Sequence, residues 1–124
     1  MLAIDTSAWI EWLLDSPLGG QMAPLFACWP NCVVPTIVQL ELAKWGMHNH
    51  GVARIRNVLR YTRRCDVVPL TTKIAFQAAR MHRQYGLATA DAIIYATARL
   101  HKASLLTCDA HFAHLPAVIF FRKH

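Results

Sequence analysis

Acidic side chains are rare in this chain, and four of its seven aspartates and glutamates interrupt apolar segments. These four are Asp5, Glu41, Asp91 and Asp109. Asp5 and Asp109 each close a short apolar run of strand type, whereas Glu41 and Asp91 lie on apolar faces of segments with helical periodicity. Because open α/β sheets bind ligands at the carboxyl ends of their strands, the four carboxylates are candidates for one shared site.

A cluster of four carboxylates has a definite chemical consequence. Two unit charges about 4 Å apart repel by roughly 4 kcal/mol at an effective dielectric constant of 20. Such a cluster therefore persists by taking up protons or by binding a hard cation, and Mg²⁺ and Mn²⁺ prefer oxygen ligands. Beside a basic surface, the cation would polarise a phosphodiester and lower the pKa of an attacking water. The pattern thus predicts nuclease chemistry.

Each acid also has a simpler interpretation when it is taken alone. Asp5 and Asp109 are suitable helix N-caps. Glu41 precedes Lys44 by three residues and can pair with it on the same side of a helix. Asp91 is stabilised by the helix dipole if its helix begins near Thr89. Only the combination of all four at one sheet edge favours the metal site.

The elements that position these acids follow from the alternation of short apolar runs with longer helical patterns. This alternation indicates βαβ units and a mostly parallel sheet, which is the α/β fold class. We predict strands near residues 2–5, 32–34, 66–69, 104–107 and 117–121. Helices are predicted over about residues 7–14, 18–28, 36–47, 51–63, 72–84 and 89–101. With no repeat or linker, residues 1–124 are expected to form a single domain.

The composition excludes several classes of protein. Hydrophobic residues make up 55% of the chain and charged residues 16%, which excludes intrinsic disorder and predicts surplus apolar surface for a partner or a second copy. The longest apolar stretches are broken before they near the roughly 20 residues of a membrane span, by Asp5, Glu11, Gln39, Glu41 and Asp91. No basic segment precedes the apolar start, so we expect no secretory signal and a cytoplasmic protein. Cys28, Cys32, Cys65 and Cys108 are expected to be buried free thiols.

Positive charge is concentrated in one segment. Thirteen lysines and arginines give a net charge of +6 and a pI near 9.6, which suits a polyanionic partner. Five arginines fall within eleven residues and are interleaved with apolar residues at helical spacing: Arg54, Arg56, Arg60, Arg63 and Arg64. We interpret this segment as an amphipathic helix whose basic outer face contributes to RNA binding, with a merely solvated face as the alternative.

Four short motifs occur in order along almost the whole chain. They are Ile4-Asp5-Thr6-Ser7, Pro35-Thr36-Ile37-Val38-Gln39-Leu40-Glu41-Leu42, Thr89-Ala90-Asp91-Ala92-Ile93-Ile94-Tyr95-Ala96-Thr97-Ala98 and Leu106-Thr107-Cys108-Asp109-Ala110-His111-Phe112. In order and spacing they resemble the PIN-domain ribonucleases, and in size and layout the VapC-type toxins of bacterial toxin–antitoxin pairs. The resemblance implies a three-layer α/β/α fold with a short sheet of about five strands.

The resemblance also implies roles for individual residues. Asp5, Glu41, Asp91 and Asp109 would form the acidic site, with Asp5 and Asp91 as direct Mg²⁺ ligands and Mn²⁺ able to substitute. Thr107 would support the site by hydrogen bonding to a carboxylate or a metal-bound water. The position after Asp5 varies in the family, so Thr6 is carried over only as a possible helper.

The activity implied by the resemblance is metal-dependent hydrolysis of RNA by an activated water, without the ribose 2′-hydroxyl as nucleophile. Members of the family form homodimers and are blocked by a cognate antitoxin in a higher assembly. We therefore expect a Mg²⁺-dependent endoribonuclease that acts as a toxin, with RNA, an antitoxin and a second copy of the chain as partners.

Three other interpretations stay open. A non-catalytic RNA-binding or protein-interaction module on the same fold is the main competitor, although a carboxylate cluster would repel its phosphate ligand. Cys108, His111 and His114 form the tightest zinc-like group but lack an evident fourth ligand. Trp9 and Trp12 fit the inner face of the first helix better than a base-stacking platform.

Overall fold

Five strands form a single sheet in the order β3-β2-β1-β4-β5. The strands are β1 (Leu2–Ile4), β2 (Cys32–Pro35), β3 (Asp66–Val68), β4 (Ser104–Thr107) and β5 (Val118–Phe120). All four pairings are parallel, which confirms the predicted α/β class and makes the sheet parallel throughout. The structure is a computed structural model that describes residues 1–27, 31–49 and 51–123, apart from the side chains of residues 49 and 51–55.

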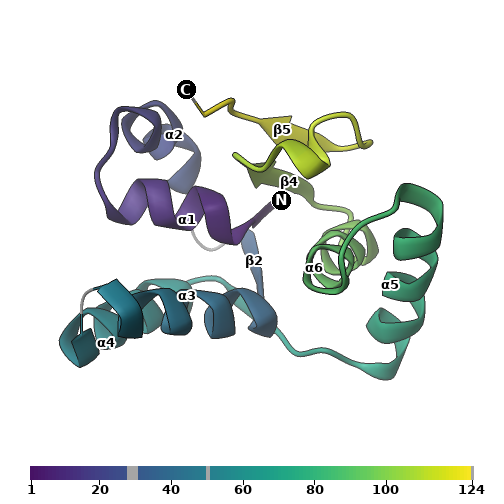
Figure 1. Cartoon of the computed structure of the whole chain (residues 1–124), viewed down its shortest axis with the longest axis horizontal. Helices are drawn as coiled ribbons and strands as arrows, with labels where there is room; N and C mark the ends of the chain where they lie inside the picture. Colours follow the sequence, from purple (N-terminus) through teal and green to yellow (C-terminus); the bar gives the residue numbers. More distant parts are fainter. Residues whose placement is uncertain (28–30, 50, 124) are drawn as a thin grey trace.

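Six α-helices and one short 3-10 helix connect the strands in the described ranges. They are α1 (Thr6–Leu13), α2 (Pro17–Phe26), α3 (Thr36–Asn49), α4 (Gly51–Thr62), α5 (Thr72–Tyr85), α6 (Thr89–Leu100) and the 3-10 helix η1 (Ala110–Phe112). In Figure 1, α1 to α4 lie on one side of β2, and α5 and α6 lie on the other. This is the predicted α/β/α arrangement, and each predicted helix and strand is present within a few residues of its expected bounds.

Local sequence signals set several helix ends. Ser16 caps α2 by accepting a hydrogen bond from the Gly19 amide at 2.9 Å, and Pro17 occupies the first helical position, where its missing N–H is harmless. Gly86 ends α5 with a φ of 69°, a left-handed conformation that favours glycine. No helix in the described part of the chain is long and apolar enough to cross a membrane.

The core lies between the sheet and the two helical layers, and its largest fully buried side chains include Trp9, Tyr95 and Phe26. Trp9 packs edge-on against Phe26 with ring centroids 5.3 Å apart, and Trp12 stacks on the same ring at 4.8 Å. The two tryptophans therefore form the inner face of α1, as the helical spacing predicted. Their packing on Phe26 holds α1 against α2, directly after the segment that carries Asp5.

The prediction of free thiols is wrong for two cysteines, because Cys32 and Cys65 form a disulfide. The register of β2 and β3 pairs Val33 with Asp66, so the preceding residues of the two strands are also neighbours. Their Cα atoms are 5.0 Å apart, which is ordinary for a disulfide. Cys108 is a buried free thiol, as predicted, and Cys28 lies outside the described residues.

Candidate active site

The sheet brings two of the predicted acids to one edge. β1 and β4 are neighbours with Ile4 opposite Leu106, and the Asp5 amide donates to the Leu106 carbonyl at 2.9 Å. Asp5 directly follows β1, and Asp109 comes two residues after the end of β4. Although 104 residues separate them in sequence, the parallel register alone makes them neighbours.

Hydroxyl groups join these two strand ends. Oδ2 of Asp5 accepts hydrogen bonds from Ser7 Oγ at 2.7 Å and from Thr107 Oγ1 at 2.8 Å. Thr107 Oγ1 in turn accepts from the Asp109 amide at 2.9 Å, and Ser7 Oγ accepts from the Cys108 amide at 3.0 Å. The carboxylate of Asp5 is therefore held in one orientation by one hydroxyl group from α1 and one from β4.

Asp5 is not a conventional helix cap. It occupies the N-cap position of α1, but its side chain makes no capping hydrogen bond and is almost completely buried. Burial raises the pKa of Asp5, while hydrogen bonds from Ser7 and Thr107 lower it, and the charge of Asp109 raises it further. A buried acid that is oriented in this way, instead of capping its helix, is suited to a cation.

Glu41 on α3 reaches the same edge through Thr6. Thr6 Oγ1 donates to Glu41 Oε1 at 2.6 Å, so the motif threonine links α1 to α3. Among the described side chains, no ion pair connects Glu41 with Lys44, and the simpler interpretation of this acid does not hold. The carboxylate also contributes to the electrostatic potential at Asp91, where it raises the pKa.

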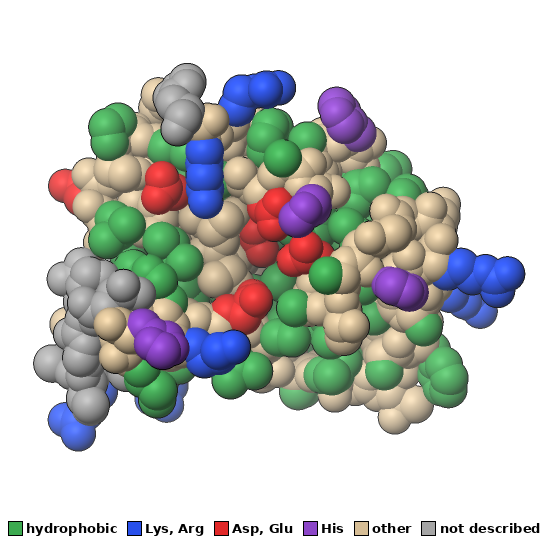
Figure 2. All heavy atoms as spheres, viewed as in Figure 1, with side chains coloured by type: hydrophobic (Ala, Val, Ile, Leu, Met, Phe, Trp, Pro, Cys, Tyr) green, Lys and Arg blue, Asp and Glu red, His purple; other side chains and the backbone are tan. Residues whose placement is uncertain are grey.

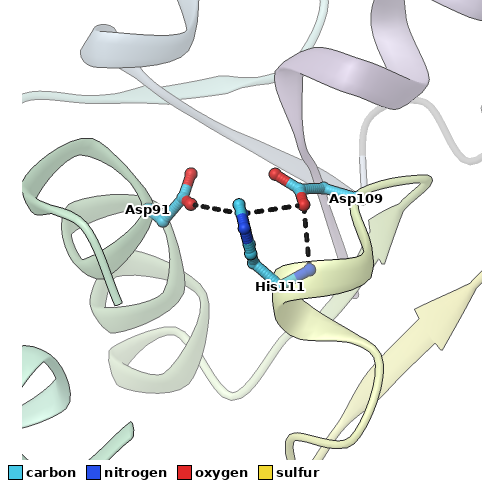
Figure 3. A group of neighbouring side chains, drawn as sticks. All are labelled: Asp91, Asp109 and His111. Carbon is cyan, nitrogen blue, oxygen red and sulfur yellow. Dashed lines mark hydrogen bonds and ion pairs between the residues drawn. The ribbon is translucent and has the colours of Figure 1, made fainter. Parts of the chain in front are cut away.

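Asp91, Asp109 and His111 converge from two elements (Figure 3). His111 Nδ1 lies 3.1 Å from Asp109 Oδ1 and 3.7 Å from Asp91 Oδ2. The Asp109 side chain also caps η1 by accepting a hydrogen bond from the His111 amide at 2.9 Å. Asp109 is therefore a helix N-cap, as its simpler interpretation predicted, and it belongs to the acidic group as well. Asp91 lies in the first turn of α6, as its simpler interpretation required.

The surroundings of Asp91 disfavour the ionised form of its carboxyl group. Burial, then the charges of Asp109 and Asp5, raise the pKa of Asp91 to about 6, against a smaller opposing contribution from His111. Glu41 adds to the increase. The other three predicted acids thus all raise the pKa of Asp91, and a carboxylate among like charges takes up a proton or a cation more readily.

The donor set fits a divalent cation. One ligand atom from each of Asp91, Asp109 and His111 lies within 4.8 Å of the other two. Mg²⁺ binds oxygen at about 2.0–2.1 Å in octahedral geometry, so adjacent ligands around one ion are about 3 Å apart. The 3.1 Å and 3.7 Å separations both run from Nδ1 of His111, a nitrogen that Mg²⁺ does not favour, so the two carboxylates are the oxygen ligands that this group offers to Mg²⁺.

Two residues of the site were not predicted from the sequence. Ser7 was quoted only as part of a motif, although its hydroxyl contacts three groups of the site. His111 was considered only as a zinc ligand with Cys108 and His114, a trio that is not among the possible metal-binding groups of the described residues. The spacing of two residues between Asp109 and His111, across a short helical turn, is the sequence signal that could have identified His111.

The arginine segment lies away from these acids. Its first three arginines lie in α4, which packs on α3, and Arg63 and Arg64 follow the end of this helix. The side chains of Arg56, Arg60, Arg63 and Arg64 are exposed. Arg64 lies over the Tyr61 ring with 5.5 Å between its guanidinium carbon and the ring centroid. The side chain of Arg54 lies outside the described residues.

The family follows from the comparison with family models. The model described as "PIN domain" matches residues 2–118. This chain belongs to the PIN domain family, and the family predicted from the four motifs is confirmed. Among curated proteins, none matches the chain significantly.

Solved structures share the fold over nearly the whole chain. A toxin–antitoxin complex from Klebsiella pneumoniae has a TM-score of 0.83 at 24% identity and covers 99% of this chain and 100% of its own. The sarcin-ricin loop cleaving toxin VapC20 of Mycobacterium tuberculosis gives 0.80 at 18% identity, with 99% and 100% covered. DNA-bound VapBC from Salmonella typhimurium has a TM-score of 0.74 at 16% sequence identity, with 98% of each chain covered.

Replacing the bridging hydroxyl of Thr107 tests whether it orients Asp5. Thr107→Val keeps the side-chain volume but removes the donor to Asp5 and the acceptor for the Asp109 amide. We expect RNA cleavage to fall by about 10- to 100-fold, the usual effect of losing a group that orients a metal ligand. Thr97→Val is the control, because this buried hydroxyl donates only within its own helix, to Ile93. Equal activities of the two variants would remove Thr107 from the site.

Proposed function

We propose that this chain is a Mg²⁺-dependent endoribonuclease and the toxin of a toxin–antitoxin pair, with Mn²⁺ able to replace Mg²⁺. One observation carries the proposal: acids from three separate parts of the fold lie near the strand ends, where burial together with the charges of Asp109 and Asp5 raises the pKa of Asp91 to about 6. A purely structural fold has no reason to assemble charges that repel one another. The similarity to a structure described as an RNA-cleaving toxin supports the same reading.

We assign the residues as follows. Asp5 and Asp91 hold the cation, Asp109 adds a further oxygen ligand, and Glu41 adds negative charge from α3. His111 lies beside the carboxylates of Asp91 and Asp109. Ser7 and Thr107 orient Asp5 through their hydroxyl groups. When bound, the cation supplies the Lewis acidity that polarises the scissile phosphate and lowers the pKa of an attacking water. The arrangement requires no nucleophile from the protein.

RNA is the substrate that we propose, and the exposed arginines of α4 are one surface for its backbone. Phosphate contacts by Arg56, Arg60 and Arg63 would offset the repulsion that the acids exert on a polyanion. A non-catalytic RNA-binding module on this fold is the second candidate, and the exposed arginines favour it equally. The acids decide between the two, because a module that only binds RNA is weakened by them.

We also propose an antitoxin and a second copy of this chain as partners, and the cytoplasm as the site of action. The Klebsiella pneumoniae neighbour is a toxin–antitoxin complex, which supports the first partner. Several large apolar side chains remain exposed and support further contacts: Leu14, Leu40, Met47, Leu70 and Phe76. These side chains are the apolar surface that we propose for such contacts.

The nucleophile provides a sharp test of this function. Once a cut is mapped, an RNA with a single 2′-deoxynucleotide on the 5′ side of the cut should be cleaved at nearly the unmodified rate, because water attacks the phosphate. An enzyme that uses the ribose hydroxyl would leave the modified RNA intact and yield cyclic phosphate ends from the unmodified one. That result would overturn the proposed chemistry while leaving the PIN fold unaffected.

A further inference from the structure

A large hollow with charged side chains in its lining lies beside the acidic group. Its volume is about 610 Å³, and its lining includes Ser7, Asp109, Phe120, Arg122 and Lys123. A volume of this size falls within the usual range of small-molecule and cofactor sites. Since Ser7 and Asp109 also belong to the acidic site, the hollow and the site share a wall.

The sheet register places the two basic residues of the hollow. β5 runs parallel to β4 with Phe120 opposite Thr107, and the Phe121 amide donates to the Thr107 carbonyl at 2.9 Å. Arg122 therefore follows directly after the segment that pairs with the end of β4, close to Asp109. Ladder pairing fixes this placement up to Phe121, directly before the first basic residue.

The charges in the hollow are available to a ligand. Arg122 and Lys123 are exposed, and neither takes part in an ion pair among the described residues. Lys123 also borders a smaller hollow with Glu11. Figure 2 shows a group of acidic side chains in the middle of this face, with other acidic side chains toward its left edge and with basic side chains both around the central group and at the outer edges. A polyanion that places one phosphate at the acids needs cations for the next phosphate, and Arg122 and Lys123 are cations of this kind.

From this geometry we propose that the hollow holds the nucleotide adjacent to the scissile phosphate of a bound RNA strand. Arg122 and Lys123 bind its phosphate, and the ring of Phe120 offers a face for its base. The inference rests on the proposed function and adds a second cationic surface to that of α4. It places this surface at the site itself, whereas the α4 arginines lie beyond α3.

Salt-dependent binding tests the proposal without cleavage. Binding of a fluorescein-labelled, single-stranded 12-nucleotide RNA is measured by fluorescence anisotropy over a series of KCl concentrations, using the full chain with Asp91→Asn so that the RNA stays intact. In this background, Arg122→Ala/Lys123→Ala is compared with Lys73→Ala/Arg80→Ala. The control pair removes the same charge from exposed positions of α5, outside the hollow.

We expect the Arg122→Ala/Lys123→Ala variant to reduce the slope of log affinity against log salt by about 1.4, or about 0.7 for each lost contact to a single strand. The control pair should leave the slope unchanged. Phe120→Leu should weaken binding by about 5-fold or more at every salt concentration with no change in slope, because stacking releases no counterions.

Unchanged slopes in both the hollow variant and the control variant would overturn the proposal, because the RNA would then follow another path. An equal fall in the slope of both variants would also overturn it, since the loss of net charge alone would explain the effect. Failure of the wild-type protein to cut RNA would contradict only the proposed function, because the slopes report binding in the hollow independently of cleavage.

Discussion

Asp91→Asn is expected to abolish RNA cleavage and, at the same time, to stabilise the metal-free protein. The first effect follows from the loss of a charge that holds the cation, and we expect the rate to fall by about 100- to 1000-fold or more. The second follows from the neighbours of Asp91, because burial and the charges of Asp109 and Asp5 raise its pKa to about 6. A group of that kind opposes folding whenever it is ionised.

The sign of the pH dependence follows from proton linkage. Between the ordinary aspartate pKa of 3.8 and the value of about 6 in the fold, the folded protein binds more protons than the unfolded chain. The free energy of unfolding of the metal-free protein should therefore rise as the pH falls from about 7.5 to 5. In Asp91→Asn this contribution is absent, so the variant should be more stable than wild type by about 1–3 kcal/mol at pH 7.5 and by less at pH 5.

Urea unfolding in EDTA at both pH values measures this difference, and the exposed Asp66→Asn serves as the matched control. The control should change stability by no more than about 0.5 kcal/mol. Addition of Mg²⁺ should stabilise wild type and not Asp91→Asn, because only a folded site with its full donor set binds the ion. A strongly destabilised Asp91→Asn protein would show that this acid is structural.

Gly19→Ala is expected to produce the largest loss of stability among single-methyl substitutions in the described helices. A Cβ at Gly19 would collide with the carbonyl oxygen of Glu11 and approach the Trp12 Cα to 3.0 Å, and these backbone atoms cannot give way as a side chain would. We expect the free energy of unfolding to fall by about 3 kcal/mol. The helix α1 would shift, and with it the segment that positions Asp5.

Gly20→Ala is the matched control for this prediction, because no atom lies within 4 Å of the added methyl group. Replacing a helical glycine by alanine in open space should stabilise the protein by about 0.5–1 kcal/mol. Opposite signs at adjacent glycines, measured by urea unfolding, would establish the close packing of α1 on α2. Similar small effects at both positions would contradict it.

Much of the fold was predictable because its signals are local. Apolar runs, helical periodicity and breakers such as Gly86 locate each element to within a few residues, and alternation of strands with helices indicates a parallel sheet. The disulfide was missed because it depends on register. Cys32 and Cys65 are separated by 33 residues, and only the pairing of Val33 with Asp66 makes them neighbours.

The acidic site was predictable only as a set of positions. The apolar surroundings of Asp5, Glu41, Asp91 and Asp109 show in the sequence, but the hydroxyl bridge does not. Ser7 and Thr107 have spacings that suit many roles, and their link to Asp5 exists only once β1 and β4 are paired. The partner of Glu41 was likewise set by packing, because the contact of α1 with α3 places Thr6 Oγ1 2.6 Å from Glu41 Oε1.

The central claim, that these acids hold a divalent cation which drives RNA cleavage, is tested most directly by one assay. Purified wild-type protein and Asp91→Asn are incubated with total cellular RNA in Mg²⁺, in Mn²⁺ and in EDTA, and the products are separated on a denaturing gel. We predict discrete cuts by wild type in both metals, none in EDTA and none by the variant. Cutting that persists equally in EDTA or in Asp91→Asn would contradict the claim.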